Sequence, residues 1–394
     1  MDAKMASWKS TGTYVDEVPP PGANIVDGMR IFKVKRPPGY PPAFKARYVA
    51  RGFSQQQSVY FQTFSPTPKM TTLRVLLHVA AQRDYELHSL DFSTAFLQGS
   101  LHEEILLRRP PGFTGSFPAV LLYVNDLATA DTKALTLLKS ELQNRYTCTD
   151  LGELHNYLGL QITRDRARRT ITLTQSHMVH QVLQCFGFQF SSQQPTPLST
   201  GHLLSAPPSD ESVEPSVPYL ELVGCLMYLM TCTRPDLAYP LSLLARYVAP
   251  GRHRKVHLDA AKRVLCYLCS TSGMGLVLGG WGPVVLTGHA DASWELRWLT
   301  YLQTDLGEQP CSPPVLYVDD KAMIALCQEH RTKHIALRYF LARELQQRGQ
   351  LHLAYVATRV NTADIFTKAL PPGDHQRFST MLGLVPTLPH LLTA

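Results

Sequence analysis

Apolar and polar positions in the first half of the chain predict a mixture of strands and helices. Short alternating or apolar runs bounded by turn residues predict strands, and apolar positions repeating every three to four residues predict helices. The predicted strands lie at 31–34, 46–50, 87–92 and 120–124, with two more flanking the turn at 165–169. The predicted helices lie at 71–82, 131–146 and 176–186. In the second of these helices we expect one apolar face, made of Ala134, Leu137, Leu138 and Leu142.

The second half has a helical middle and then returns to strands. Helical patterns fill most of residues 217–272 and predict three helices there. A proline- and serine-rich loop at 193–218 precedes them and is the best candidate for a domain boundary. The whole pattern predicts an α+β fold. Beyond the helical middle, strands are predicted at 284–290, 314–318 and 351–356, and helices near 295–306, 320–329, 335–348 and 362–369.

Composition adds limits to this picture. With 44% hydrophobic and 18% charged residues among 394, the chain has an ordinary globular composition and room for two or three domains. Its net charge of +7 favours a polyanionic partner without requiring one. The polar start and a longest apolar run of only 222–230 predict neither a signal peptide nor a transmembrane segment, so we expect an intracellular protein. Cys266 and Cys269 lie in a helical pattern, which favours packing over zinc binding.

A carboxylate near the end of an apolar strand is the first candidate for chemistry. Asp91 lies at the end of the predicted strand 87–92, and the aromatic Phe96 follows five residues later. Two-metal nucleotidyl transfer needs carboxylates clustered on adjacent strands, because they must hold two Mg²⁺ ions roughly 3.5–4 Å apart. Taken alone, Asp91 is more simply explained as a cap of the following turn.

A series of motifs in one order changes that weighting. The motifs are FKARYVARGFSQ (44–55), YFQTFSPTPKMTTLRVLL (60–77), LDFSTAFLQGSL (90–101), RRPPGF (108–113), LLYVND (121–126), DLGELHNYLGLQI (150–162), LVGCLMYLMTCTRPDLAY (222–239), DAAKRVLCYL (259–268), GHADASW (288–294), YVDDKAMIAL (317–326), HRTKHIALRYFLARE (330–344) and NTADIFTKAL (361–370).

This series covers nearly the whole chain and closely resembles the polyprotein of copia-type retrotransposons, from its reverse transcriptase to the end of its ribonuclease H. The resemblance implies reverse-transcriptase fingers and palm, a helical connector and a ribonuclease H-like domain. It also implies an RNA template, a DNA primer and an RNA–DNA hybrid as partners, and Mg²⁺ as cofactor.

The resemblance implies roles for four residues of the fingers and palm. Asp91 would be the first metal-binding carboxylate of the polymerase palm. Phe96 would be the aromatic gate that excludes a 2′-hydroxyl from the incoming nucleotide. Lys45 and Arg47 would grip the triphosphate, although a solvated strand edge is the alternative explanation of these two cations.

Two YVxD tetrads compete for the place of the polymerase signature. A polymerase tetrad lies at the tip of a hairpin, but the tetrad at 317–320 is followed by a helical pattern. Strand, Asp and helix in succession are typical of ribonuclease H, so the resemblance makes Asp319 a ribonuclease H metal ligand. The polymerase tetrad is then 123–126, in which Asp126 is a metal ligand and the neutral Asn125 stands in place of a carboxylate.

The resemblance also implies two internal losses. After the motif at 108–113 the family carries a tract that builds a long palm helix, but here Pro118 leads almost directly into the tetrad strand. In ribonuclease H, Asp291, Asp319 and Asp364 match three of the four metal-binding carboxylates, whereas the Glu and the segment around it are missing. We therefore expect an internally deleted copy with damage to both catalytic centres.

Four segments are expected along the chain. A reverse-transcriptase fingers and palm remnant covers 1–192, a linker with the helical thumb and connection region covers 193–280, a truncated ribonuclease H-like domain covers 281–372, and a C-terminal tail covers 373–394. The favoured function is a retrotransposon-derived RNA-directed DNA polymerase and ribonuclease H that is catalytically defective. The alternatives are a non-catalytic nucleic-acid-binding remnant and a gene-model fragment of an active element. The basic turn 164–169 is expected to be solvated, with phosphate contact as the less favoured alternative.

Overall fold

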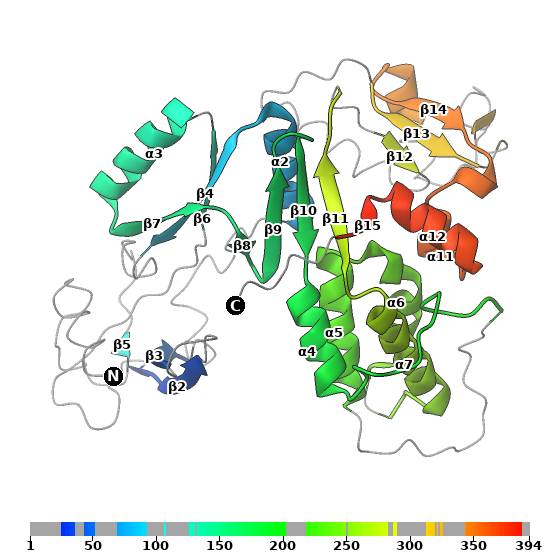
Figure 1. The fold of residues 1–394 in the computed structure, drawn as a ribbon, viewed down its shortest axis with the longest axis horizontal. Helices are drawn as coiled ribbons and strands as arrows, with labels where there is room; N and C mark the ends of the chain where they lie inside the picture. Colours follow the sequence, from blue (N-terminus) through cyan, green and yellow to red (C-terminus); the bar gives the residue numbers. More distant parts are fainter. Residues whose placement is uncertain are drawn as a thin grey trace. The chain divides into compact units, whose positions relative to one another are not determined.

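The computed structural model divides the chain into two compact units. Unit 1 comprises residues 1–67 and 87–153, and unit 2 comprises residues 68–86 and 154–394. These units group the residues differently from the four predicted segments, which are defined by resemblance and stay a prediction. Figure 1 shows the elements of both units. The residues that the structure describes are 25–35, 43–51, 69–92, 106–107, 126–130, 132–201, 218–249, 251–282, 287–289, 313–319, 321, 324–325 and 343–387.

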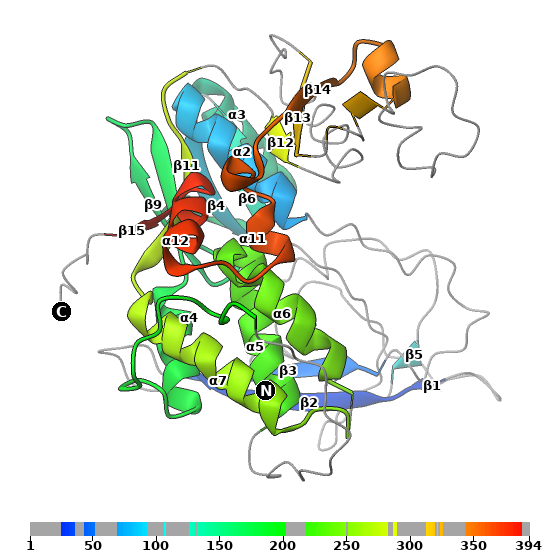
Figure 2. The same ribbon diagram turned by 90° about the vertical axis from the view of Figure 1, so that its right-hand side faces the viewer.

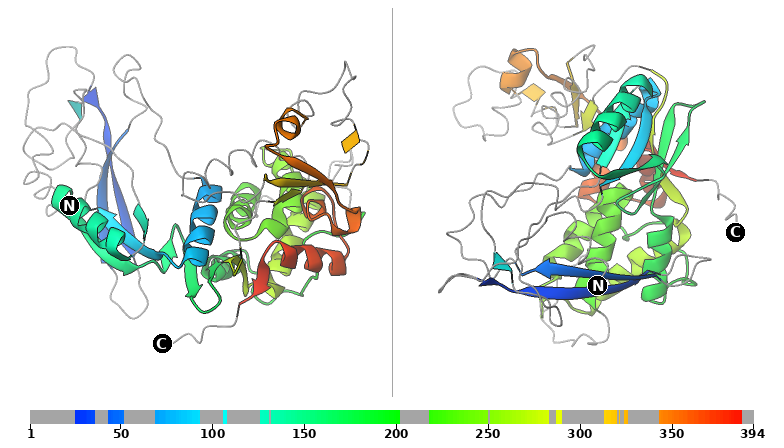
Figure 3. Two further views of the ribbon diagram at one scale, coloured as in Figure 1. Left: turned by 90° about the horizontal axis from the view of Figure 1, so that it is seen from above. Right: turned by 90° about the vertical axis from the view of Figure 1, so that its left-hand side faces the viewer.

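In its described residues, unit 1 contains three small groups of strands and one helix. Strands β2 (Gly28–Lys35) and β3 (Ala43–Ala50) form an antiparallel ribbon, drawn in blue in Figure 3. β4 (Glu86–Phe92) lies between β6 (Asp126–Ala130) and β7 (Cys148–Glu153), and helix α3 (Thr132–Arg145) contacts β6 and β7. A two-residue parallel pair, β1 (Ile25–Val26) with β5 (Leu106–Leu107), completes the described part. The strands predicted at 31–34, 46–50 and 87–92 and the helix at 131–146 are confirmed.

Two details of unit 1 differ from the sequence-based expectations. Leu137 and Leu138 are exposed (65% and 37%), so these two members of the predicted apolar face of α3 are wrong. Leu142 is half-buried, and the side chain of Ala134 lies outside the described residues. The buried leucine is Leu135 (3% exposed), because α3 turns the face of Leu135 and Leu142 inward. The sequence after the tetrad predicts a short returning strand, Leu127–Ala128, before a helix start, but β6 extends over five residues and pairs with β4. The strand predicted at 120–124 lies outside the described residues.

Unit 2 contains a five-stranded antiparallel sheet in the order β15–β11–β10–β9–β8. Helix α2 (Met70–Arg83) contacts β10 and β11, and its buried residues include Leu73 and Leu77. The pattern predicts α2, β9 and β10 but not β11 or β15. The strand bounds are β8 Asn156–Tyr157, β9 Leu160–Asp165, β10 Thr170–Thr174, β11 Met274–Gly279 and β15 Leu384–Pro386.

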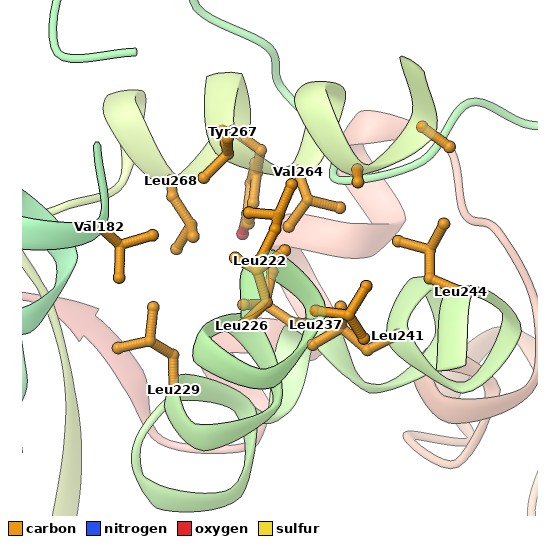
Figure 4. Packing of buried hydrophobic residues seen from close by; sticks show 14 of the residues in the cluster. Val182, Leu222, Leu226, Leu229, Leu237, Leu241, Leu244, Val264, Tyr267 and Leu268 are labelled. Atoms are coloured by element: carbon orange, nitrogen blue, oxygen red, sulfur yellow. The ribbon is translucent and has the colours of Figure 1, made fainter. Parts of the chain in front are cut away.

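The main hydrophobic core of unit 2 lies among four helices: α4 (Ser176–Cys185), α5 (Tyr219–Cys232), α6 (Ala238–Leu244) and α7 (Lys255–Ser270). Figure 2 shows them side by side, and Figure 4 shows leucines of α5 and α6 packed beneath α7. The helix predicted at 176–186 and the three helices predicted within 217–272 are confirmed. A short 3-10 helix, η4 (Pro235–Leu237), links α5 to α6.

A second, smaller sheet of unit 2 is wholly parallel. β12 (Thr287–His289), β13 (Val315–Val318) and β14 (His352–Tyr355) lie in the order β12–β13–β14. These strands confirm the three predicted at 284–290, 314–318 and 351–356. The helix predicted near 295–306 lies outside the described residues, and those near 320–329 and 335–348 are described only in part.

Two helices follow the parallel sheet. The helix expected near 362–369 is seen as α11 (Asp364–Thr367). A second helix, α12 (Pro372–Met381), occupies the segment that was expected to be a tail. The fold is α+β, as predicted. None of the helices that the structure describes is long and apolar enough to span a bilayer.

Gly279 at the end of β11 is a position where a side chain is expected to be costly. Its φ of +92° is rare for L-residues, and an added Cβ would overlap the Arg169 carbonyl oxygen and lie 2.6 Å from the Ala81 Cβ. We expect Gly279→Ala to lower the free energy of unfolding by about 1–3 kcal/mol in urea denaturation. Gly273→Ala is the matched control, because a Cβ there meets nothing within 4 Å and its φ is not positive. Equal losses for the two variants would contradict the prediction.

Candidate functional site

The two palm carboxylates expected from the sequence lie on neighbouring strands. Asp91 pairs with Thr149 of β7 and has an exposed side chain, whereas the preceding Leu90 is buried (3% exposed). Alternation along β4 therefore turns Asp91 to the open face of the sheet. Asp126 begins β6, the hydrogen-bonded neighbour of β4 on its other side. Asn125 and Phe96 lie outside the described residues, as does the side chain of Asp126.

Lys139 links α3 to the sheet and forms an ion pair with Asp150, an acidic residue of β7. The Lys139 ammonium lies 2.7 Å from Asp150 Oδ2 and 2.7 Å from His88 Nδ1. The hydrogen bond from Lys139, with a second from the Gly152 N–H, holds the pKa of Asp150 below its ordinary value. Asp150 is thus used as a structural anchor for α3.

The two predicted triphosphate ligands lie on strand β3 of the ribbon. The backbone register pairs Lys33 with Lys45 and Ile31 with Arg47. Like charges at directly opposed positions of an antiparallel pair are unfavourable unless an anion lies between them. In the backbone register, Lys45 is therefore opposite another lysine, whereas Arg47 is opposite an apolar residue.

The predicted ribonuclease H carboxylates are only partly described. Asp319 directly follows β13 and is half-buried, while Asp291 lies outside the described residues. β13 is parallel to both of its neighbours, and residues 321 and 324–325 are helical. A hairpin tip would require an antiparallel neighbour, so the tetrad at 317–320 follows the strand, Asp and helix order expected from the sequence.

The remaining ribonuclease H candidate, Asp364, is the first residue of α11. Its side chain is nearly buried, and its Oδ2 lies 2.7 Å from the Lys368 ammonium. Helix α11 contacts α6 and η4. In the described part of the chain, no three His, Cys, Asp or Glu side chains are grouped so that they could hold a metal ion.

A buried polar network near η4 was missed by the sequence analysis. Arg234 and Asp236 form an ion pair at 2.7 Å with both side chains at most 2% exposed. The Asp236 carboxylate also accepts a hydrogen bond from the Tyr267 hydroxyl (2.7 Å), and Arg234 donates to the Thr271 hydroxyl (2.8 Å). Burial alone would raise the pKa of Asp236, but the guanidinium and the hydroxyl hold it below its ordinary value. The sequence does contain a signal for this network, since Arg234 and Asp236 carry opposite charges two residues apart between two apolar helices.

His375 of α12 closes this network and makes it sensitive to pH. Its Nε2 lies 3.4 Å from the Asp236 carbonyl oxygen, and its ring meets the Tyr267 ring edge-on. Burial lowers the pKa of His375, the Asp236 carboxylate opposes that shift, and Arg234 adds to it. The folded protein therefore holds this imidazole neutral at pH values where the unfolded chain binds a proton.

We expect the free energy of unfolding to fall as the pH drops below about 6.5, the ordinary pKa of histidine. The slope approaches about 1.4 kcal/mol per pH unit per proton until the lowered pKa of His375 is passed, below which the loss is complete. Urea denaturation between about pH 8 and pH 5 measures it. His375→Gln should flatten the profile, and His180→Gln is the matched control at an exposed position. Equal profiles for His375→Gln and the parent chain would refute the assignment.

The basic turn at 164–169 is not the solvated turn that the sequence predicts. Arg164 and Arg166 donate to Asp84 Oδ1 at 2.8 and 3.1 Å, and Arg169 lies 3.7 Å from Asp84 Oδ2. Asp84 ends α2 in the left-handed conformation (φ 58°), which turns its carboxylate toward the β9–β10 turn. Of the arginines in this turn, Arg168 is the one left largely in solvent (83% exposed). Most of the arginines in this turn are therefore paired with a carboxylate of unit 2.

A cavity of about 410 Å³ lies among α4, α5 and α7. It contains none of the predicted catalytic or nucleotide-binding residues. Its lining residues are Cys185, Phe186, Phe188, Pro218, Glu221, Leu222, Lys262 and Leu265.

Comparisons with known proteins agree with the motif series. Residues 17–117 match the family model described as reverse transcriptase (RNA-dependent DNA polymerase). The chain is 29% identical to the retrovirus-related Pol polyprotein from transposon TNT 1-94 of Nicotiana tabacum, over 98% of this chain and 37% of the relative. It is 28% identical to the Pol polyprotein from transposon RE2 of Arabidopsis thaliana, over 94% of this chain and 33% of the relative. A foamy viral protease-reverse transcriptase in complex with double-stranded DNA superposes with a TM-score of 0.46 at 12% identity, over 89% of this chain and 68% of that one.

The lengths of these alignments carry further information. The chain spans about a third of the length of these curated relatives. The tobacco alignment runs over 502 positions, 108 more than the 394 residues of the chain, and the Arabidopsis alignment runs over 481, 87 more. At least that many positions of each relative therefore have no counterpart here. The resemblance to the polyprotein of copia-type retrotransposons, from its reverse transcriptase onward, is confirmed along nearly the whole chain.

Proposed function

We propose that the chain is a retrotransposon-derived RNA-directed DNA polymerase and ribonuclease H in which both magnesium centres are incomplete. The observation that carries the polymerase part is the position of Asp91 and Asp126 on neighbouring strands, which is where a palm holds its metal ligands. The ancestral partners would be an RNA template, a DNA primer and their hybrid.

Loss of polymerase activity follows from the ligand count. Asn125 offers a neutral oxygen where the family has a carboxylate, which weakens the hold on Mg²⁺ where metal stabilisation is worth several kcal/mol. The positions of the relatives that have no counterpart here are consistent with a missing palm segment before residue 119. Asp91 and Asp126 are then too few to hold two ions.

Loss of ribonuclease H activity follows from a similar count. Asp291, Asp319 and Asp364 remain, but the fourth carboxylate and its helix have no match in the sequence. Asp364 is neutralised by Lys368 in the absence of a metal, so Mg²⁺ would have to displace an ion pair. Among the residues that the structure describes, no three His, Cys, Asp or Glu side chains are grouped to hold a metal ion, but Asp291 and the side chain of Asp126 lie outside those residues.

Primer extension on an RNA template with Mg²⁺ tests the polymerase part, and cleavage of an RNA–DNA hybrid tests the ribonuclease H part. We expect no extension above that of the Asp91→Asn variant and no cleavage above that of Asp319→Asn. Asn125→Asp should fail to restore extension, because the carboxylate alone does not replace the missing palm segment. Extension or cleavage that exceeds the matching variant would overturn the proposal.

Nucleic-acid binding without catalysis is the second candidate. It is favoured by the backbone register of the β2–β3 ribbon, which sets Lys33 opposite Lys45 and so offers a phosphate backbone two cationic positions on neighbouring strands. We expect binding to an RNA–DNA duplex to weaken with salt, and the slope of log K against log salt to shrink by about two in Lys33→Gln/Lys45→Gln. Arg168→Gln is the control for loss of an exposed cation elsewhere. An unchanged slope in the double variant would argue against this site.

The third candidate is a gene model that omits tracts present in the transcript. Sequencing the messenger across the junctions at 117–121 and 293–296 separates this from a deletion in the element itself. If the messenger contains the palm tract and the ribonuclease H tract, the proposed function would include both activities.

A further inference from the structure

The chain returns to the main core of unit 2 after it leaves the parallel sheet. We name residues 361–387 the C-terminal clasp. This segment contains α11, α12 and β15. In the described residues, α11 contacts α6 and η4, α12 contacts η4, and β15 contacts β11. The strands β12, β13 and β14 make their principal contacts with one another.

The strand of the clasp completes the five-stranded sheet. β15 pairs antiparallel with β11, with Leu276 opposite Leu384 and Met274 opposite Pro386. The Val277 N–H donates to the Gly383 carbonyl at 2.9 Å, and the Thr387 N–H donates to the Gly273 carbonyl at 2.8 Å. Hydrogen bonds therefore extend beyond both ends of β15 and cover the outer edge of β11, which would otherwise be an open sheet edge.

The helix of the clasp closes the core over the buried ion pair. Phe378 is 1% exposed and packs with Ile365 and Leu370 of the same segment. His375 contacts the Asp236 carbonyl and the Tyr267 ring, so α12 lies against the residues that hold Arg234. Without α12, this ion pair would lose part of the cover that keeps it from water.

The parallel sheet has a hydrophobic cluster of its own. This cluster includes Leu316, Val318 and Leu353, and it is separate from the cluster of α4–α7. The chain enters the parallel sheet after β11 and leaves it before α11, so the helical core and its sheet are built from residues on both sides of it.

We infer that the C-terminal clasp is part of the folding unit of the helical core, and that the parallel sheet of β12, β13 and β14 is inserted in that unit. The core then opens together with the clasp, and the parallel sheet opens by itself.

Amide hydrogen exchange of the full chain, read by mass spectrometry, tests this. We expect Phe378→Ala to lower protection roughly 100-fold in α7 and β11 as well as in the clasp, and to leave β13 and β14 unchanged. Leu353→Ala should do the reverse. Met381→Ala, on the exposed side of the same helix (52% exposed), should change neither.

Two outcomes would overturn the inference. Loss of protection in Phe378→Ala that stays within residues 361–387 would make the clasp an appended tail. Equal loss in β13 and β14 would make the parallel sheet part of the same cooperative unit. If Phe378→Ala leaves no protected amides anywhere, the milder Phe378→Leu repeats the comparison, and the same two outcomes decide it.

Discussion

Replacing Asp236 with alanine is expected to lower the free energy of unfolding by about 3–5 kcal/mol, the largest effect of any substitution considered. The change leaves the Arg234 guanidinium charged and without its carboxylate at a position that is at most 2% exposed. The Tyr267 hydroxyl would lose its acceptor at the same time. Because a single domain is stable by only about 5–15 kcal/mol, such a loss would be a large fraction of the total stability.

Urea denaturation followed by circular dichroism measures this loss, and a double variant supplies its control. In Arg234→Met/Asp236→Leu no buried charge is left over, so we expect less than half of the loss in Asp236→Ala. Thr271 and Tyr267 would still lose partners, which is why some loss should persist. A cost below about 1 kcal/mol for Asp236→Ala, or a greater cost for the double variant, would show that the pair contributes little.

The helical core could be predicted from the sequence because its signal is local. In α5 and α7 the apolar positions recur within one or two turns, and that spacing alone marks a helix and its buried face. β11 and β15 could not be predicted in the same way. β15 has only three residues, and what makes it a strand is pairing with β11, more than a hundred residues earlier.

In the candidate site, too, some features could be expected from the sequence, and others depend on contacts between distant residues. The adjacency of the strands of Asp91 and Asp126 was expected from the resemblance, and the structure shows those strands as neighbours. The use of Asp84 by the arginines of the turn 164–169 was not expected, since it depends on the left-handed end of α2 meeting a hairpin about 80 residues away. Charge runs in a sequence thus say little about which cations are free for a ligand until their partners are known.

A comparison of two leucines on α5 shows which face of this helix carries the stability of unit 2. Leu226 is fully buried among the leucines and valines of α4, α6 and α7 (Figure 4). Leu220 on the same helix is 65% exposed. Leu226→Ala removes the same atoms as Leu220→Ala, but it also leaves a cavity that the packed helices can only partly fill.

We therefore expect Leu226→Ala to cost about 2–5 kcal/mol in urea denaturation and Leu220→Ala to stay within about 0.5 kcal/mol of the parent chain. The two variants share a helix and a change in helix propensity, so the difference between them reports burial alone. If both cost the same, the exposed face of α5 would also be covered in solution. A loss below about 1 kcal/mol for Leu226→Ala would mean that the four helices do not form the close-packed core on which the clasp and the Arg234–Asp236 pair depend.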